Sequence, residues 1–343
     1  MKYIGNKTRL LEFIYDSMVK SNIPMNGVFC DIFSGTSSVA KFFKEKRFKI
    51  ISNDFMTYSF IAQFVNVKMN KLPAFIKITD YGIDEVLNIL NNLEPYEGYA
   101  FDNYAPSGKY GRKYFSDANA KKIDAIRDKI EEWKNNNKLT EEEYYILVYS
   151  LIDAADFVAN ISGTYGAYLK IWRSMALKPL TLQRPTIFDN GYDNEVYQMD
   201  SNELIKDISS DVLYIDPPYN ERQYAPNFHV LESLAVWDKQ ELLGKTGQRD
   251  YSTKKSRYCL KREATDAFED LINNVKTKYI VLSYNNEGII SRENILKILN
   301  NKGKVKEYST NYRRFRTEKD NEHRHYKKCD DKVVEHLFVV ICE

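Results

Sequence analysis

Residues 28–54 read VFCDIFSGTSSVAKFFKEKRFKIISND, and this stretch decides the fold. Two short apolar runs within it, Val28–Phe33 and Phe48–Ser52, have the length and composition of buried strands. Between them, residues 36–46 carry apolar side chains at helical spacing. A strand, a helix and a second strand in this order predict a parallel pair of strands in a sheet that helices cover.

The same alternation continues over most of the chain. Further apolar runs of strand length are Glu195–Met199, Val212–Ile215, Tyr279–Tyr284 and Glu335–Cys342. Amphipathic segments of helical period lie at 7–22, 57–70, 227–237, 264–275 and 291–301. Residues 304–315 form a candidate strand without an obvious helix before the last one, so we expect the sheet to end in an antiparallel pair. The predicted fold class is α/β, with a mostly parallel sheet.

The alternation stops between residues 71 and 185. Long helical patterns occupy 117–137 and 140–160, and no convincing buried strand occurs there. We therefore expect a sheet domain made of residues 1–70 and 186–343, with a mostly helical domain inserted at 71–185. This insertion is interpreted as a module that binds a partner or reads a substrate. The alternative is an elaboration that only stabilises the sheet domain.

The composition of the 343 residues, 43% hydrophobic and 29% charged, is that of an ordinary globular protein. No run of about 18 apolar residues occurs and the first residues are too polar for a secretory leader, so we expect a cytoplasmic protein without a membrane span. The net charge of +2 is uneven: residues 239–262 and 302–328 carry +6 each, and the rest of the chain carries −10. Two basic segments on an acidic chain are typical of a protein that meets a polyanion.

The spacing of cysteine and histidine does not favour a metal site. The four cysteines lack the paired spacing of zinc sites. His323, His325 and Cys329 lie close together, but in a highly charged stretch and without a second pair of ligands. We therefore expect no metal.

Polar residues follow both strands of the opening stretch. Asp31–Thr36 ends the first strand and leads into a helix, as a tight turn of small residues that lets the backbone approach a ligand closely. Many such turns bind nothing, and the glycine fingerprint of dinucleotide-binding folds is absent. Asp54 follows the second strand, where an acidic side chain can accept hydrogen bonds from ribose hydroxyls. Capping of the next helix is an equally open alternative for Asp54.

Asp216, Pro217, Pro218 and Tyr219 follow directly on the buried run 212–215. Because proline fixes φ and has no N–H, the Asp216 carboxylate and the Pro217 carbonyl can present two aimed acceptors with no competing donor. The residue before a proline is held extended, and Tyr219 supplies a flat stacking surface. Two acceptors and a ring fit a planar group that carries an amino group. A plain turn at the end of a strand is the alternative.

In their order along the chain, these residues resemble the Dam-like, alpha class of DNA adenine methyltransferases, which includes the modification methylases of type IIS restriction systems. Tyr3–Lys7 looks like the N-terminal cofactor motif of that class, Asp31–Thr36 like its FxGxG motif and Asp54 like its ribose carboxylate. Tyr197–Asp200 looks like the strand whose acidic residue holds the adenine amine of the cofactor. Asp216–Tyr219 is the DPPY tetrad of the class, unaltered. The insertion resembles the target-recognition domain mainly in its placement.

The resemblance implies a Rossmann-like, S-adenosylmethionine-dependent fold. It also implies transfer of a methyl group from S-adenosylmethionine to the exocyclic amine of an adenine flipped out of double-stranded DNA, at a specific site. The residues implied to bind the cofactor are Tyr3, Lys7, Asp31, Phe33, Ser34, Gly35, Thr36, Asp54 and Asp200. The residues implied to act in catalysis are Asp216, Pro217, Pro218 and Tyr219. A separate cognate restriction endonuclease fits the same context.

One position departs from the pattern of the class. FxGxG reads Phe33–Ser37 here as FSGTS, with serine in place of the last glycine. Serine is small and can cap a helix, so we expect S-adenosylmethionine to be tolerated.

The basic segments can now be interpreted. The loop after the tetrad puts a cation and an aromatic ring beside the expected target pocket, and the basic segment 239–262 follows that loop. The side chains expected to contact DNA are Arg222, Tyr224, Lys254, Lys255, Arg257, Arg313 and Arg314. For any one of them, a solvated surface position is the alternative.

Two other functions stay open at this point. The same tetrad serves amine methylation of adenine in RNA, which is the main alternative. A sheet domain that binds nucleic acid without modifying it is less favoured, because a pure binder has no need for the tetrad and the two cofactor carboxylates.

Overall fold

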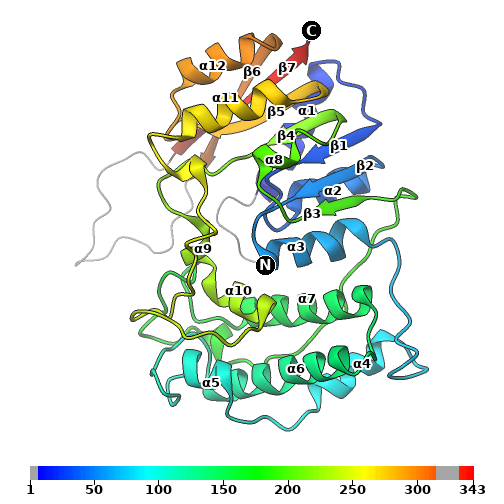
Figure 1. Ribbon diagram of the computed structural model, residues 1–343, viewed down its shortest axis with the longest axis vertical. Helices are drawn as coiled ribbons and strands as arrows, with labels where there is room; N and C mark the ends of the chain where they lie inside the picture. Colours follow the sequence, from blue (N-terminus) through cyan, green and yellow to red (C-terminus); the bar gives the residue numbers. More distant parts are fainter. Residues whose placement is uncertain (1–6, 314–331) are drawn as a thin grey trace. The chain divides into compact units, whose positions relative to one another are not determined.

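The structure is a computed structural model that describes residues 7–313 and 332–343, and it divides the chain into two compact units. Residues 7–55, 190–224, 253–313 and 332–343 form the sheet unit. Residues 56–189 and 225–252 form the helical unit. Figure 1 shows the elements of both.

The sheet unit is built around one sheet, whose strand order in the described residues is β3-β2-β1-β4-β5-β7-β6. The strands are β1 (Val28–Asp31), β2 (Lys49–Asn53), β3 (Glu195–Tyr197), β4 (Ser210–Ile215), β5 (Thr277–Asn285), β6 (Gly303–Arg313) and β7 (Lys332–Cys342). From β3 to β5 all neighbours pair in parallel, and β7 pairs antiparallel with β5 and with β6. This confirms the predicted α/β sheet and its terminal antiparallel pair.

Helices cover both faces of this sheet (Figure 1). On one face lie the short helix η1 (Thr8–Leu10), α1 (Leu11–Lys20) and α2 (Ser38–Glu45). On the other lie α8 (Ser201–Leu204), α11 (Ala264–Asn274), which the short helix η4 (Arg257–Cys259) precedes, and α12 (Arg292–Asn300).

Successive side chains of a strand point alternately into the two hydrophobic cores of the sheet unit, one on each face of the sheet. Phe29 of β1 stacks on Phe43 of α2, with ring centroids 4.0 Å apart. Its neighbour Cys30 faces the opposite core, together with Phe268 and Leu271 of α11. A parallel sheet that is buried on both faces explains why its strands read as nearly continuous apolar runs.

The helical unit contains the long helices predicted from the sequence. Its elements are α3 (Thr57–Gln63) with the π-helical turn η2 (Phe64–Lys68), α4 (Ile83–Asn91), α5 (Tyr99–Tyr104), α6 (Asp117–Asn135), α7 (Glu141–Phe157), η3 (Ser174–Leu177) and α10 (His229–Val236). The short helix α9 (Tyr224–Asn227) spans the point where the chain enters it from the sheet unit. Thr140 and Glu143 begin α7 with a reciprocal capping box. No helix among the described residues is long and apolar enough to cross a membrane.

This division differs from the boundaries at residues 70 and 186 that we expected from the sequence. Residues 56–70 and 225–252 group with the insertion, because α3 and α10 pack against each other and against α7. The Glu232 carboxylate of α10 accepts hydrogen bonds from the amides of Thr57 and Tyr58 at 3.1 Å each, where α3 begins. Contacts between residues so far apart in the chain cannot be predicted from the order of the elements in the sequence.

Candidate active site

Two carboxylates lie where the neighbouring strands β1 and β4 end. Asp31 is the last residue of β1 and pairs with Tyr214 of β4, so Asp216 follows two residues later on the same side of the sheet. The chain order of the strands reverses between β1 and β4, and open α/β sheets bind ligands at the carboxyl ends beside such a reversal. The motif residues therefore gather where the fold is suited to hold a ligand.

Asp31 is buried without a complete set of hydrogen bonds. Its side chain is 1% exposed, and its Oδ1 has no hydrogen-bond partner among the described residues. Burial, and secondly the charge of Asp216, raise the pKa of Asp31 to about 8. A buried polar atom that the chain leaves unpaired needs an explanation, and a ligand that donates a hydrogen bond at this edge would provide one.

Asp54 ties the end of β2 to the turn after β1. Its Oδ2 accepts a hydrogen bond from the Gly35 amide at 2.9 Å. The N-cap residue of α3 is Met56, not Asp54, and the amides of Thr57 and Tyr58 at the start of that helix donate to the Glu232 carboxylate. The half-buried carboxylate therefore stays at the edge, where a ribose is expected.

Ser37 shows why the FxGxG pattern ends in glycine. Its φ is +64°, in the left-handed region that glycine adopts without strain, and Gly35 has φ +52°. Ser37 is the N-cap residue of α2, but its hydroxyl donates to the Thr36 carbonyl at 2.6 Å and makes no capping hydrogen bond. The amide of Ser37 donates to the Ser34 carbonyl at 2.8 Å, which keeps the turn tight.

Asn53 is a positioning residue of the edge that sequence reasoning missed. It is buried, and its side-chain amide donates to the carbonyls of Ile32 at 3.2 Å and Met199 at 3.1 Å. The Met199 amide donates back to its oxygen at 3.0 Å. Asn53 thus places the chain just before Asp200, whose exposed carboxylate accepts from the Asn202 amide at 2.9 Å and caps α8. An amide at a strand end is visible in the sequence, but its partner 146 residues away is not.

Asp216 belongs to a buried network of charges. The Lys7 Nζ lies 3.2 Å from Asp216 Oδ1 and 2.5 Å from Glu335 Oε1. The Ser283 hydroxyl donates to the same Glu335 oxygen at 2.7 Å. Burial raises the pKa of Asp216 to about 7, although Lys7 opposes this. Burial lowers the pKa of Lys7, but the charges of Asp216 and Glu335 outweigh it and hold that pKa well above its ordinary value.

The positions of Lys7 and Glu335 in this network could not be predicted from the sequence. The resemblance assigned Lys7 to cofactor binding, whereas the structure places its ammonium between two carboxylates. Glu335 was not predicted at all; its only signal is one acidic residue in an apolar strand. Because β7 runs antiparallel to β5, its first residues lie at the edge where β5 ends, and Glu335 pairs with Asn285.

The rest of the tetrad is anchored beside this network. The Lys7 Nζ lies 5.5 Å from the centroid of the Tyr219 ring, and the ring of Tyr284 meets that ring edge-on at 6.1 Å. The Tyr219 carbonyl accepts from the Ile289 amide at 3.0 Å. Pro217 is buried. The tetrad therefore has supports in β5 and in the loop after it.

Residues 254–259, which we call the strap, connect the loops of this edge. The Lys254 ammonium donates to the Phe55 carbonyl at 2.8 Å, just after β2. In the loop after the tetrad, the Gln223 side chain exchanges two hydrogen bonds with the backbone of Ser256, at 2.8 and 3.0 Å. The strap therefore joins the loop that carries Gln223 to the end of β2.

The strap also reaches the turn after β1. The ring of Tyr258 meets the ring of Phe33 edge-on, with centroids 5.0 Å apart. The Tyr258 hydroxyl donates to Asn202 Oδ1 at 2.8 Å, where α8 begins. Phe33, expected to contact the cofactor, is thus held between the core and the strap.

The residues expected to bind DNA have different surroundings. Arg222, Lys255 and Arg257 are exposed, and the Arg257 Nε lies 3.5 Å from a Glu263 oxygen. Tyr224 is half-buried. The Lys254 ammonium uses one of its three N–H groups on the Phe55 carbonyl, so it is partly engaged within the chain. Other expected positions lie outside the described part of the chain: Tyr3, Arg314 and the side chain of Arg313.

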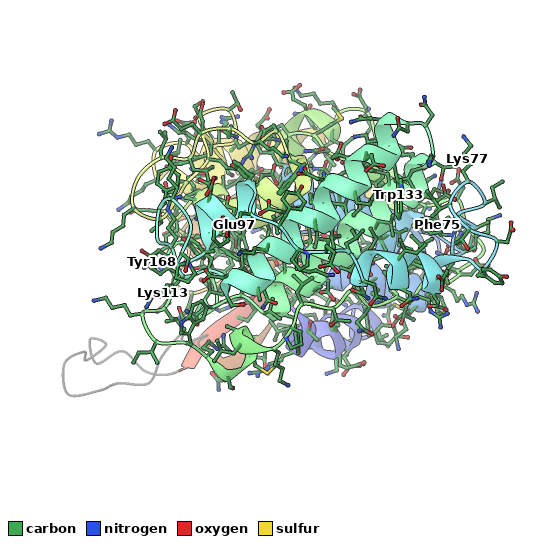
Figure 2. The ribbon with its side chains drawn as sticks, turned by 90° about the horizontal axis from the view of Figure 1, so that it is seen from below. Phe75, Lys77, Glu97, Lys113, Trp133 and Tyr168 are labelled. Atoms are coloured by element: carbon green, nitrogen blue, oxygen red, sulfur yellow. The ribbon has the colours of Figure 1, made fainter. Side chains whose placement is uncertain are left out.

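The helical unit holds a braced segment, residues 160–173. Asn160 is fully buried and accepts from the Arg173 amide at 3.1 Å. Its own amide donates to the carbonyl of Lys113 at 3.2 Å. The side chains of Lys113 and Tyr168 are labelled in Figure 2. Both side chains are partly exposed, and the Lys113 ammonium donates to the Lys170 carbonyl at 3.5 Å.

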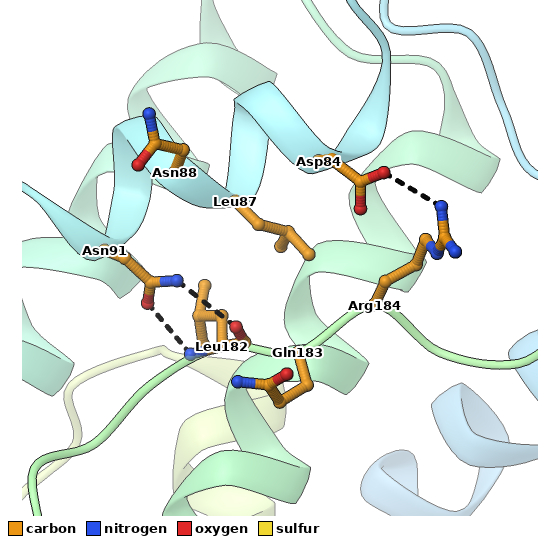
Figure 3. Close-up of a pocket in the computed structure, with 7 residues that line it drawn as sticks. All are labelled: Asp84, Leu87, Asn88, Asn91, Leu182, Gln183 and Arg184. Carbon is orange, nitrogen blue, oxygen red and sulfur yellow. Dashed lines mark hydrogen bonds and ion pairs between the residues drawn. The ribbon is translucent and has the colours of Figure 1, made fainter.

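A shallow pocket of about 450 Å³ also lies in the helical unit, between α4 and residues 182–184 (Figure 3). Asp84 pairs with Arg184 across it at 2.8 Å. Asn91 exchanges hydrogen bonds of 2.8 and 3.2 Å with the backbone of Leu182. These polar groups pair with one another, unlike Asp31 at the sheet edge.

The described residues contain no group of three or more His, Cys, Asp or Glu side chains that could hold a metal ion. His323, His325 and Cys329, which were considered from the sequence, lie outside them.

Comparison with known protein families shows to which family the chain belongs. The family model of the D12 class N6 adenine-specific DNA methyltransferases matches residues 3–298, a range that includes Asp31, Asp54 and Asp216. The chain belongs to this family. The match ends before Glu335, so that residue lies outside what the family model covers.

Individual relatives cover nearly the whole chain. The type II methyltransferase M.NlaIII of Neisseria lactamica is 42% identical over 328 residues, which are 95% of either chain. The modification methylase StsI of Streptococcus sanguinis is 44% identical over 302 residues, 87% of this chain and 46% of its own. The type II methyltransferase M.FokI of Planomicrobium okeanokoites is 40% identical over 329 residues, 94% and 50% of the two chains. The chain thus spans about half the length of the last two relatives.

Proposed function

We propose that the protein transfers a methyl group from S-adenosylmethionine to the exocyclic amine of an adenine in double-stranded DNA, at a specific target site. The observation that carries the proposal is the position of Asp216. This largely buried carboxylate of the DPPY tetrad lies beside the strand reversal, and the Lys7 ammonium lies at one of its oxygens. Membership of the D12 family supports the base and the atom.

The edge around β1 fits S-adenosylmethionine. The turn through Gly35 and Ser37 brings the backbone close to a ligand, and Asp54 suits ribose hydroxyls. Asp31 is costly to ionise alone, and a ligand that brings N–H donors or positive charge would stabilise its carboxylate. The further side chains proposed to hold the cofactor are Tyr3, Lys7, Phe33, Ser34, Thr36 and Asp200. When bound, S-adenosylmethionine supplies an electrophilic methyl group.

Asp216 and Pro217 orient the target amine. The carboxylate and the carbonyl accept its two N–H groups, which favours a more tetrahedral nitrogen with its lone pair free to react. The negative charge of Asp216 also stabilises the positive charge that develops on this nitrogen. After transfer the nitrogen loses one proton, and a carboxylate with a pKa of about 7 is suited to accept it near neutral pH.

Tyr219 and Pro218 complete the target pocket. A base inside a duplex cannot reach Asp216, so the adenine must be flipped out of the stack. The Tyr219 ring, supported by Tyr284, offers the flipped base a stacking surface that replaces part of the lost stacking. Positioning of base and methyl group supplies the rest of the acceleration.

DNA contacts are proposed for exposed cations of the sheet unit and for the helical unit. Arg222, Lys255 and Arg257 are exposed and suited to phosphates. The helical unit, which presents Lys113 and Tyr168 beside a braced segment, is proposed to read the target sequence. The relatives are named as type II methyltransferases and modification methylases, so we propose that this protein also belongs to a restriction–modification system, with a separate endonuclease.

The test is transfer of labelled methyl from S-adenosylmethionine to unmethylated duplex DNA. We expect label in adenine at one short sequence, located by sequencing modified bases in DNA from cells that express the protein. Transfer to structured RNA with none to DNA would overturn the proposed substrate.

A further inference from the structure

We propose that Glu335 is a positioning residue of methyl transfer: it keeps the Lys7 ammonium at one oxygen of Asp216 and so leaves the other oxygen to the target amine. This inference rests on the proposed function, because it assumes that Asp216 accepts the amine. Glu335 lies on β7, beyond the residues that the family model matches.

The sheet itself holds Glu335 in place. Ser283 of β5 pairs with Leu337 of β7, so Glu335 is its diagonal neighbour on the same face. The Ser283 hydroxyl donates to Glu335 Oε1 at 2.7 Å, and Glu335 is 3% exposed. Its carboxylate therefore has little freedom to move, and the position of Lys7 follows from it.

The Lys7 ammonium is shared unequally between two carboxylates. Its Nζ is 2.5 Å from Glu335 and 3.2 Å from Asp216, and all three side chains are largely buried. Charge-assisted hydrogen bonds are strong where water is excluded, so a lysine without Glu335 would be drawn onto Asp216. There it would compete with the adenine amine for the same carboxylate. The Asp216 side chain is 14% exposed, so a ligand can still reach it.

The proton affinity of Asp216 depends on the same balance. Burial raises the pKa of Asp216 most, Lys7 lowers it and Glu335 raises it. Four ionisable groups interact with Asp216: Lys7 before η1, Asp31 of β1, Tyr214 of β4 and Glu335 of β7. Tyr219 of the tetrad interacts with Lys7. Removing the charge of Glu335 and removing that of Lys7 must therefore shift the ionisation of Asp216 in opposite directions.

The test is Glu335→Gln, which keeps the shape and an oxygen acceptor for Ser283 and removes only the charge. We expect kcat for methyl transfer to fall about 10- to 100-fold, with a smaller change in the calorimetric affinity for S-adenosylhomocysteine. We also expect the acid limb of kcat against pH to move down by about one unit. In Lys7→Gln the limb should move up.

Two further variants serve as controls. Glu335→Asp keeps the charge with a shorter reach, so it should lower kcat less than Glu335→Gln and leave the limb nearer its original place. Glu12→Gln removes the same charge from an exposed position on α1 and should change neither readout.

The outcomes separate the two proposals. A Glu335→Gln protein with the kcat of the wild type, or with a lower kcat and an unmoved limb, overturns the positioning role. A wild-type protein without activity on DNA contradicts the proposed function instead. If Glu335→Gln does not fold, the pH profile of Lys7→Gln is the deciding measurement. An acid limb of kcat that does not move up in that variant overturns the inference.

Discussion

The helical unit and the edge of the sheet both bury an aspartate, but they treat it differently. Asp124 of α6 accepts hydrogen bonds from the amides of Gly98, Ala100 and Phe101, at 3.1, 2.7 and 2.8 Å, where α5 begins. Asp31 leaves one oxygen without a partner among the described residues. Burial raises the pKa of both, to about 7 for Asp124 and about 8 for Asp31. A raised pKa alone therefore does not distinguish a structural carboxylate from one that we propose to bind a ligand. The two differ in how many of their oxygens accept hydrogen bonds from the chain.

The buried cations differ in the same way. Arg127 of α6 is fully buried and donates to the carbonyls of Leu234 and Ala235, to the Tyr144 hydroxyl and to Glu131. All of these partners belong to the helical unit, and they tie α6 to α7 and to the end of α10. Lys7 is instead shared with the tetrad carboxylate. In the helical unit the buried Arg127 stabilises the packing of helices, whereas at the sheet edge the buried Lys7 contacts the carboxylate that we propose to act in catalysis.

The largest effect that would test this contrast is expected from Asp216→Ala. Without the carboxylate, the amine has no charged acceptor, so we expect methyl transfer to fall by about 10³-fold or more. Binding of S-adenosylhomocysteine, measured by calorimetry, should persist. Asp207→Ala, at an exposed position of the sheet unit, is the matched control and should keep its activity. An active Asp216→Ala protein would remove Asp216 from the mechanism.

Arg127→Met should affect stability instead of chemistry. It removes a buried charge and leaves Glu131 and several carbonyls without their donor, so we expect a loss of about 3–5 kcal/mol in the free energy of unfolding. Chemical denaturation measures this. Lys129→Met, on the same helix and partly exposed, should cost less than about 1 kcal/mol. Equal losses in both variants would contradict the structural role of Arg127.

Asp31→Asn should change the pH dependence of stability. The pKa of Asp31 in the folded protein, about 8, exceeds its ordinary value of 3.8, so the native state binds more protons between these values and stability falls as pH rises. Without this ionisable group, the free energy of unfolding should fall less steeply as pH rises. At pH 9 the ligand-free variant should be more stable than the wild type by about 1–3 kcal/mol. Calorimetric binding of S-adenosylmethionine should weaken. Asp124→Ala is the contrasting variant and should destabilise at every pH, because three amides lose their acceptor.

The smallest effect is expected in the strap. Replacing Lys255 and Arg257 by alanine should lower the slope of log K for DNA against log salt by about 2, measured by fluorescence anisotropy. Lys254→Ala should lower it less, because the Lys254 ammonium already donates to the Phe55 carbonyl. An unchanged slope after all three replacements would remove the strap from the DNA interface.

Local features of the fold and site could be predicted from the sequence. Strands such as β1 and β4 are apolar runs of a few residues, and the tetrad restricts its own backbone through its prolines. Ribose binding and helix capping were equally open for Asp54, and the structure has Met56, not Asp54, as the N-cap residue of α3. Serine at position 37 could be expected from its size alone to fit the turn, but the sequence does not show that its φ is +64° or that its hydroxyl makes no capping hydrogen bond.

The sequence by itself determined the class of sheet and the identity of the tetrad, because apolar periodicity and motif residues are local features of the chain. The tertiary structure decided that residues 56–70 and 225–252 group with the helical unit. Only the tertiary structure decided what surrounds the tetrad. Glu335 meets Lys7 across 328 residues of chain because β7 enters antiparallel beside β5, and Asn53 meets Met199 because β2 lies next to β3. Such pairs are set by strand order and direction, which local periodicity does not encode.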